Sequence, residues 1–324
     1  MRYSFLFPGQ GAQTPGMGKD LFDFSSEVRE LFRLASSSCG FDVAELVFEG
    51  SEEDLKATDN TQIAITVTNL ASAAVLREFG IKSDRLAGFS LGEYAALVEA
   101  GVLDLESVFP VVRARGQLME QASRALDSAD GPAGMTAVLG LEYETVVSVL
   151  EQIADAYPGI HNSPLQTVVS GSAAALSAAE AALKAAGARR VVRLKVSGPF
   201  HSPLMVDARN ELEKELAGIE FRDPRKPIYS NVTAKALESG EELKRSCIEQ
   251  LVRPVQWVAT MNRMVADEVA GFLEVGPGTV LGGLWNAWLK AHPEVMLQCT
   301  PVGTLEQIKA LVSLESSRSV VSAS

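Results

Sequence analysis

The sequence predicts an α/β protein with a mostly parallel sheet and a small inserted subdomain. Short apolar runs typical of buried strands alternate with longer stretches at helical spacing. A Gly-x-Ser-x-Gly motif stands between such a strand and such a helix, and the elements become shorter after residue 133. The 324 residues are 47% hydrophobic and 22% charged, so the chain can bury a sizeable core.

The first part of the large domain, residues 1–126, begins with a strand over Tyr3–Phe7. Pro8-Gly-Gln-Gly-Ala-Gln13 follows as a tight loop with exposed backbone N–H groups, which can stabilise an anion or serve as an ordinary turn. A second strand leads into Gly88. Helical patterns cover residues 25–37, 43–48, 61–79, 93–100 and 101–122.

A boundary is predicted at Asp127-Ser-Ala-Asp-Gly-Pro-Ala133, which is polar and rich in helix breakers. Beyond it, strands over 135–139, 166–170 and 190–195 alternate with helices over 142–156 and 173–186. Two β-α-β passes within about 65 residues predict a ferredoxin-like subdomain over 127–197.

The second part of the large domain covers residues 198–314. Helices are predicted over 202–217, 240–251 and 304–314, a further segment over 254–266, and strands over 228–231 and 271–275. We expect the Ser-rich end, residues 315–324, to be a disordered tail.

Composition disfavours several classes of partner. The net charge is −12 without a basic tract, which disfavours nucleic acid and anionic membranes. No apolar run has the length of a membrane span, and the N-terminal apolar run is too short for a signal peptide. Cys39, Cys247 and Cys299 form no C-x-x-C, which argues against a disulfide framework or zinc site. We expect a soluble, cytoplasmic protein without a metal or cofactor.

The motif Gly88-Phe-Ser-Leu-Gly92 has the strand–turn–helix context of a nucleophile elbow. The turn is so tight that both flanking residues must be glycine, and Ser90 is exposed near the positive end of the following helix. A chance match is the alternative in a chain with 26 glycines, so a second residue has to support the interpretation.

A serine nucleophile needs a base, and the chain has three histidines. His292 lies in a polar loop, and His161 lies at the edge of a small-subdomain strand. His201 lies in a breaker-rich loop where the chain re-enters the large domain, and active sites collect at such mouths. This placement favours His201 over His161.

Seven short motifs follow one another along the chain: Pro8-Gly-Gln-Gly-Ala-Gln13, Gly88-Phe-Ser-Leu-Gly-Glu-Tyr94, Arg113-Ala-Arg-Gly116, Asn162-Ser-Pro-Leu-Gln166, Gly198-Pro-Phe-His-Ser202, Pro254-Val-Gln-Trp257 and Glu274-Val-Gly-Pro-Gly278. Together they resemble the malonyl-CoA:acyl carrier protein transacylases of type II fatty-acid synthesis over residues 1 to about 310. The resemblance implies an α/β-hydrolase-like large domain and a ferredoxin-like small domain.

The resemblance also implies roles for single residues. Ser90 would accept malonyl from coenzyme A and pass it, in a ping-pong reaction, to the phosphopantetheine thiol of acyl carrier protein. His201 would be base and acid, oriented by the main-chain carbonyl of Gln250, and the backbone N–H groups of Gln10 and Leu91 would form the oxyanion hole.

Substrate selection would involve four further side chains. Arg115 would hold the malonyl carboxylate through a two-donor fork, although the sequence alone favours a solvated helix residue. Asn162 and Gln166 would line the pocket floor, or merely cap strand ends, and Phe200 fits selection of malonyl over methylmalonyl.

The sequence departs from the family pattern at two positions. Phe89 stands where the family has His before the serine, so the polarity of the pocket differs. Thr279 stands where a basic residue often follows Gly-Pro-Gly, so a contact to coenzyme A phosphate or to the carrier can be lost.

The carrier is expected to be acidic, and this chain is acidic too, so attraction between them must be local. We expect the enzyme to be a monomer. We hypothesise that a basic patch on its small subdomain docks the carrier. The patch consists of Lys184, Arg189, Arg190, Arg193 and Lys195. A solvated helix end is the alternative.

Three other functions stay open. A free-standing acyltransferase could load a polyketide synthase. A hydrolase could use water as the acceptor, although an editor of simple acyl groups has little use for Arg115. A non-catalytic carrier-binding subunit is disfavoured by the intact Ser90 and His201.

Overall fold

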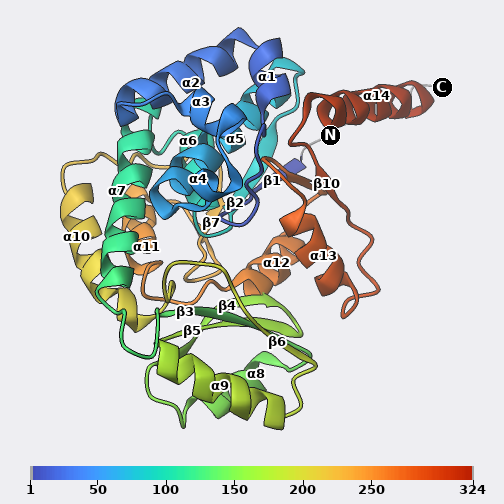
Figure 1. Cartoon of the computed structure of the whole chain (residues 1–324). Coiled ribbons are helices and arrows are strands. Elements are labelled where there is room, and N and C mark those ends of the chain that lie inside the picture. The colour runs from blue at the N-terminus through green and yellow to red at the C-terminus, as the bar shows by residue number, and fades with distance from the viewer. Residues whose placement is uncertain (1–2, 323–324) are drawn as a thin grey trace.

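Two β-sheets organise the chain in the computed structural model, which describes residues 3–322 (Figure 1). The larger sheet has six strands in the order β10-β9-β1-β2-β7-β8, and the smaller has four in the order β4-β5-β3-β6. The predicted α/β class, with a parallel-containing sheet and a second, separate sheet, is confirmed.

The six-stranded sheet is parallel except at one edge. β1 pairs with β2 and β9, β2 with β7, and β9 with β10, all in parallel, while β8 is antiparallel to β7. The strands are β1 (Tyr3–Phe7), β2 (Ser83–Gly88), β7 (Ile228–Tyr229), β8 (Ala236–Leu237), β9 (Phe272–Glu274) and β10 (Cys299–Pro301). The sequence analysis missed β8 and β10, because strands of two or three residues show no periodicity.

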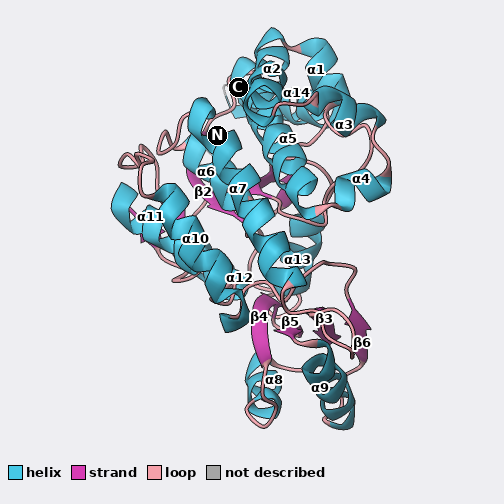
Figure 2. Cartoon of the chain, turned by 60° about the vertical axis from the view of Figure 1, so that its left-hand side comes forward, coloured by secondary structure: helices cyan, strands magenta, loops and turns pink. Residues whose placement is uncertain are grey.

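Helices bury both faces of this sheet, which explains why every residue of β1 is buried (Figure 2). Alternation along the strand sends Phe5 and Phe7 into the core formed with α5, α6 and α7, and Leu6 into the core formed with α12 and α13. The carboxyl ends of β1 and β2 therefore open at one edge of a rigid layer.

Sequence signals mark many helix ends in the larger unit. Ser51 and Asp54 form a capping box at α4, and Gly40 ends α2 in the left-handed conformation. None of the helices described between residues 3 and 322 is long and apolar enough to cross a membrane. The helices are α1 (Lys19–Phe24), α2 (Ser26–Cys39), α3 (Val43–Glu49), α4 (Glu52–Lys56), α5 (Thr58–Glu78), α6 (Gly92–Glu99), α7 (Leu105–Arg124), the 3₁₀ turn η1 (Pro203–Met205), α10 (Val206–Leu216), α11 (Gly240–Glu249), α12 (Trp257–Ala266), α13 (Val280–Leu289) and α14 (Leu305–Ser322).

The smaller sheet is antiparallel and has the strand–helix–strand–strand–helix–strand order of a ferredoxin-like unit. α8 and α9 cover one face through a core that includes Val138 and Val169, and the unit lies below the large sheet in Figure 1. Its elements are β3 (Gly134–Leu139), α8 (Tyr143–Leu150), β4 (Ala156–Ser163), β5 (Gln166–Gly171), α9 (Ala173–Ala185) and β6 (Arg190–Arg193).

The prediction of one helix over 142–156 was wrong, because α8 ends at Leu150 and β4 begins at Ala156. Pro158 and Gly159 interrupt the alternation of β4, and the register with β5 shifts twice along it. An irregular strand of this kind carries no period-two signal.

The prediction of a disordered tail from residue 315 was also wrong for the described part, since α14 continues to Ser322. The hydroxyls of Ser316 and Ser317 donate to the carbonyls of Val312 and Ser313, so these serines are satisfied inside the helix. Tyr3 donates to Glu315 at 2.7 Å. The rest of the predicted tail, residues 323–324, lies outside the described residues.

Candidate active site

Ser90 lies in a turn between β2 and α6 that only glycine neighbours allow. Its φ is +49°, a left-handed conformation that costs about 1–3 kcal/mol. A Cβ on Gly88 would lie 2.0 Å from the nitrogen of Glu93, and a Cβ on Gly92 would lie 2.0 Å from the carbonyl oxygen of Phe7. The elbow predicted from the motif is therefore present, and its glycines are required by close backbone packing.

The structure brings His201, and neither of the other histidines, to the serine. His201 Nε2 lies 2.9 Å from Ser90 Oγ, and its Nδ1 lies 2.7 Å from the carbonyl oxygen of Gln250. Because a carbonyl only accepts, Nδ1 carries the proton and Nε2 is free to accept from Ser90. His161 instead stacks on Tyr143, and His292 stacks on Trp288.

Contacts from β5 and α7, and one hydrogen bond within the loop, hold the segment that carries His201. His201 also has a positive φ, +60°. Ser170 on β5 donates to the carbonyl of Phe200 at 2.5 Å, and Ser202 donates to the carbonyl of Pro199 at 2.6 Å. Gly198 packs so tightly that a Cβ would lie 1.8 Å from Ser123 Oγ on α7. The strained loop is fixed by its surroundings.

The pKa of His201 suits a base. This pKa is lowered to about 4, chiefly because the imidazole is buried; the hydrogen bond to the Gln250 carbonyl raises the pKa and the Arg115 cation lowers it. The imidazole is therefore neutral at physiological pH and can accept a proton.

Arg115 is buried in the site, with 1% of its surface exposed, and is not a solvated helix residue. Its Nη1 donates to Gln62 Oε1 at 2.6 Å, and its Nη2 donates to Gln250 Oε1 at 2.9 Å and Ser90 Oγ at 3.3 Å. Its Nε has no partner among the described residues. Neutral oxygens hold this cation, so it keeps its charge for an anionic group beside Ser90.

Two backbone N–H groups beside the serine are available as donors. The Ser90 N–H is taken by Asn231 Oδ1 at 2.7 Å. The N–H groups of Gln10 and Leu91 donate to no protein acceptor within residues 3–322. They are the two that the family resemblance assigns to the oxyanion hole.

The three remaining pocket candidates differ in how the structure holds them. Asn162 is buried at the end of β4, and its Oδ1 has no hydrogen-bond partner in the described part of the chain, while Gln166 is half-buried at the start of β5. No hydrogen bond within the described residues joins either of them to Ser90, His201 or Arg115. Phe200 is buried directly before the base.

Three site residues escaped the sequence analysis. Gln62 holds Arg115, Asn231 holds the elbow, and Glu93 bonds both Asn231 and Gln250. Gln62 stands out in sequence as a polar residue inside the apolar helix over 61–79, and Glu93 as an acid directly after the elbow glycine. Amides and acids at such places have many structural uses, so these signals are weak.

The two departures from the family pattern have clear surroundings. The Phe89 ring meets Trp257 edge to face, with centroids 5.1 Å apart, so the position is apolar. Thr279 stands at the start of α13 without a side-chain cap. There the Glu274 carboxylate accepts from the N–H groups of Leu281 and Gly282, each at 2.8 Å, so an internal anion already occupies this helix end.

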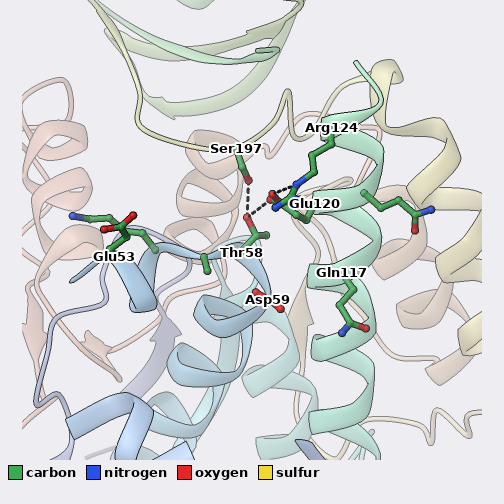
Figure 3. Close-up of a pocket in the computed structure, with 10 residues that line it drawn as sticks. Glu53, Thr58, Asp59, Gln117, Glu120, Arg124 and Ser197 are labelled. Carbon is green, nitrogen blue, oxygen red and sulfur yellow. Dashed lines mark hydrogen bonds and ion pairs between the residues drawn. The ribbon is translucent and has the colours of Figure 1, made fainter. Parts of the chain in front are cut away.

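A cavity of about 630 Å³ lies where α4, α5 and α7 meet Ser197, the last residue before the His201 loop (Figure 3). Thr58 Oγ1 lies 2.6 Å from Ser197 Oγ and donates to Glu120 at 3.1 Å. These bonds connect the segment at Ser197 to α5 and α7. Its lining carries the cations Lys56 and Arg124 and the acids Glu53, Asp59 and Glu120. This balance does not favour phosphate.

The fold and the geometry around Ser90 define an α/β acyl-transfer enzyme. Comparison with known proteins agrees, because residues 4–317 match the acyl transferase domain, and the chain belongs to this family. It is 38% identical to the malonyl CoA-acyl carrier protein transacylase of Bacillus subtilis over 287 residues, 87% of this chain and 89% of that protein.

Solved structures give the same result. The transacylase of that name from Clostridium perfringens superposes with a TM-score of 0.92 at 33% identity, covering 100% of both chains. A malonyl-transacylase in complex with the acyl-carrier protein of a type II polyketide synthase (PKS) superposes with a TM-score of 0.90 at 35% identity, covering 97% of this chain and 99% of that one.

Proposed function

We propose that the chain transfers malonyl from malonyl-CoA to the phosphopantetheine thiol of acyl carrier protein, for fatty-acid chain extension, through an ester on Ser90. One observation carries the proposal: a buried guanidinium, held only by neutral oxygens, lies 3.3 Å from the hydroxyl that His201 activates. The site thus combines a nucleophile with a receptor for a carboxylate attached to the same acyl group.

In the first half-reaction Ser90 Oγ attacks the thioester carbonyl, and its proton passes to His201 Nε2. The N–H groups of Gln10 and Leu91 stabilise the oxyanion. Collapse breaks the C–S bond, and His201 returns the proton to the departing coenzyme A thiolate, leaving malonyl-Ser90.

The second half-reaction reverses these steps with a new thiol. The carrier thiol gives its proton to His201 and attacks the ester carbonyl. The C–O bond to Ser90 then breaks, and Ser90 Oγ regains the proton. The acyl group ends as a thioester, so no metal, oxidant or cofactor is consumed.

Arg115 gives selectivity and also affects the base. A malonyl carboxylate pairs with the guanidinium, whereas an acetyl group leaves it buried and unpaired, an asymmetry of several kcal/mol. The same pairing offsets the cation that lowers the pKa of His201. A malonyl substrate therefore raises the basicity of the histidine that must act on it.

Intact-protein mass spectrometry after brief mixing with malonyl-CoA, acetyl-CoA or methylmalonyl-CoA tests the proposal. We expect a malonyl adduct that requires Ser90, and loss of malonyl acylation on the order of 100- to 1,000-fold in Arg115→Ala, with acetyl labelling gained. Equal labelling by all three thioesters would remove the role of Arg115. Thioester consumption without any adduct would indicate the hydrolase instead.

A polyketide pathway is the second candidate, because one structural relative is bound to a type II PKS carrier. The chemistry on Ser90 is the same in both. Purified holo carriers from each pathway, compared by kcat/KM with the malonyl-enzyme, distinguish them. For location we propose the cytoplasm, since Cys39, Cys247 and Cys299 are all free thiols, as a reducing compartment requires.

We further propose that residues 127–197 form the subdomain that docks the carrier. All five residues of its basic patch are exposed, namely Lys184, Arg189, Arg190, Arg193 and Lys195. Arg193 is paired with Glu180 at 2.7 Å, whereas Arg189 and Arg190 form no ion pair among the described residues. These two arginines are therefore the strongest candidates to attract an acidic partner.

Reversing the charge of both, Arg189→Glu with Arg190→Glu, should raise the KM for holo carrier on the order of 10-fold and leave coenzyme A thioester hydrolysis nearly unchanged. Lys82→Glu with Lys309→Glu is the matched control, since both lysines are exposed and lie outside residues 127–197. The same KM change in both pairs would indicate a net-charge effect and discard the patch.

A further inference from the structure

A buried carboxylate behind the elbow connects the two halves of the site. Glu93, in the first turn of α6, is 4% exposed. Its Oε1 accepts from the backbone N–H of Asn231 at 2.7 Å, and its Oε2 accepts from Nε2 of Gln250 through a short hydrogen bond. The two-step reaction gives this carboxylate no proton to transfer.

Each partner of Glu93 holds a reactive group. Asn231 accepts from the Ser90 N–H at 2.7 Å and donates to the Gly88 carbonyl at 2.6 Å, which fixes the elbow. Gln250 orients His201 through its main-chain carbonyl, donates to the Ser90 carbonyl at 3.1 Å and accepts from Arg115. The nucleophile, the base and the guanidinium are thus all one residue away from Glu93.

The directions of these hydrogen bonds are forced. Arg115 can only donate, so Gln250 must turn Oε1 towards it and Nε2 towards Glu93. The backbone N–H of Asn231 also can only donate. Both oxygens of Glu93 must therefore accept, and a protonated carboxyl would place an O–H against an N–H donor.

We propose that Glu93 is a positioning residue whose carboxylate must be ionised for the site to hold its active arrangement, and that loss of this charge sets the acidic limit of acylation. Protonation would release either Asn231 or the Gln250 side chain. The first disturbs the elbow, and the second frees Arg115 and the helix end whose carbonyl orients His201. This inference rests on the proposed transfer through Ser90.

The groups that face Glu93 support this assignment. Arg115 from α7 is a permanent cation, whereas burial raises the pKa of the Cys247 thiol on α11 and of the Tyr94 phenol on α6, so both stay neutral. Burial raises the pKa of Glu93 to about 7, against the Asn231 N–H, the Gln250 amide and Arg115, which all lower it. The pKa of His201 is about 4, too low to limit activity near neutral pH.

The test is the pH profile of Ser90 acylation by malonyl-CoA, measured by rapid quench and intact mass. The range from about pH 4.5 to 9 covers the Glu93 pKa of about 7 and stays above the His201 pKa of about 4. In the wild-type enzyme we expect the second-order rate constant to fall on the acidic side with an apparent pKa near 7. Glu93→Gln should lower the rate at high pH on the order of 10- to 100-fold and abolish that acidic limb. Glu93→Asp keeps a carboxylate, so its rate constant should still fall on the acidic side.

Glu99→Gln is the matched control. Glu99 is a second glutamate on α6 whose side chain is only 4% exposed, but it pairs with Arg77 and Lys226, away from the site. A merely structural loss should affect both variants, whereas only Glu93→Gln should lose the limb. Infrared difference spectra of Ser90→Ala with and without Glu93→Gln titrate the carboxyl directly, independent of activity.

The outcomes separate the two proposals. No acyl-Ser90 in the wild-type enzyme overturns the transfer reaction itself. Acylation with an unchanged acidic fall in Glu93→Gln, or a wild-type rate that shows no acidic fall within the measured range, overturns the role of Glu93 and leaves the transfer reaction intact.

Discussion

The two halves of the Ser90–His201 pair solve the same backbone problem by different means. Both residues have positive φ, +49° and +60°. The turn at Ser90 is set mainly by sterics within a contiguous segment, where two glycines leave no room for a Cβ, and Asn231 adds hydrogen bonds to it. His201 is held by hydrogen bonds and packing from β5, α7 and the residue after α11. Substitutions in the elbow should therefore abolish folding or acylation, whereas substitutions around the histidine loop should lower the acylation rate only in part.

The elbow should give the largest effect. In Gly92→Ala the new Cβ meets the Phe7 carbonyl oxygen of the central strand at 2.0 Å, and backbone cannot move aside cheaply. We expect destabilisation of about 3–5 kcal/mol or failure to fold, with no acylation. Denaturant unfolding and mass spectrometry measure the two effects.

Gly283→Ala is the control, because this glycine lies inside α13 with open space around its Cβ position. It should be neutral or stabilise the protein by up to about 1 kcal/mol. Similar losses in both variants would contradict the steric account of the elbow.

The histidine loop should respond more gently. Ser170→Ala leaves the buried Phe200 carbonyl without its hydrogen bond, which costs about 1–3 kcal/mol. Because this carbonyl directly precedes His201, the acylation rate should fall roughly 10-fold. Ser177→Ala removes a serine-to-carbonyl bond within the exposed face of α9, at 3.0 Å and away from the site, and should leave the rate unchanged. Equal rates in both variants would show that the loop does not depend on β5.

The same contrast explains how much the sequence could predict. The elbow is a local pattern of five residues, so the sequence alone places Ser90, and breaker residues favour His201. The amides that hold the site act over long separations, as when Gln62 meets Arg115 on another helix and Gln250 meets Ser90. No periodicity or spacing marks such pairs, and the roles of Gln250 and Arg115 came from the family resemblance.

The fold shows the same limit. Long periodic elements such as α5 and α7 were predicted, while the bulged strand β4 and the short strands β8 and β10 were missed. Pairing with neighbours defines these strands, and pairing is a tertiary property. The Ser-rich end was misjudged because polarity alone does not prevent a helix whose serines bond back to it.

The smallest expected effect is on the pH dependence of stability, where the contributions of Glu93 and His201 should nearly cancel. Glu93 has a pKa raised to about 7, so between its unfolded value and 7 the native state holds the extra proton and stability falls as pH rises. His201 has a pKa lowered to about 4, so between 4 and its unfolded value the unfolded state holds the extra proton and stability rises with pH. Each slope is at most about 1.4 kcal/mol per pH unit.

In the overlap of the two windows, roughly pH 4.5 to 6.5, the contributions of Glu93 and His201 should offset each other in the wild-type protein. Glu93→Gln removes one titration, so its stability should rise with pH more steeply than that of the wild type. His201→Gln removes the other and should show the opposite change. Urea unfolding across this range, with Glu99→Gln as the reference, measures the slopes. Parallel curves in all four proteins would mean that neither group titrates as its burial requires, and the acidic limit assigned to Glu93 would lose its physical basis.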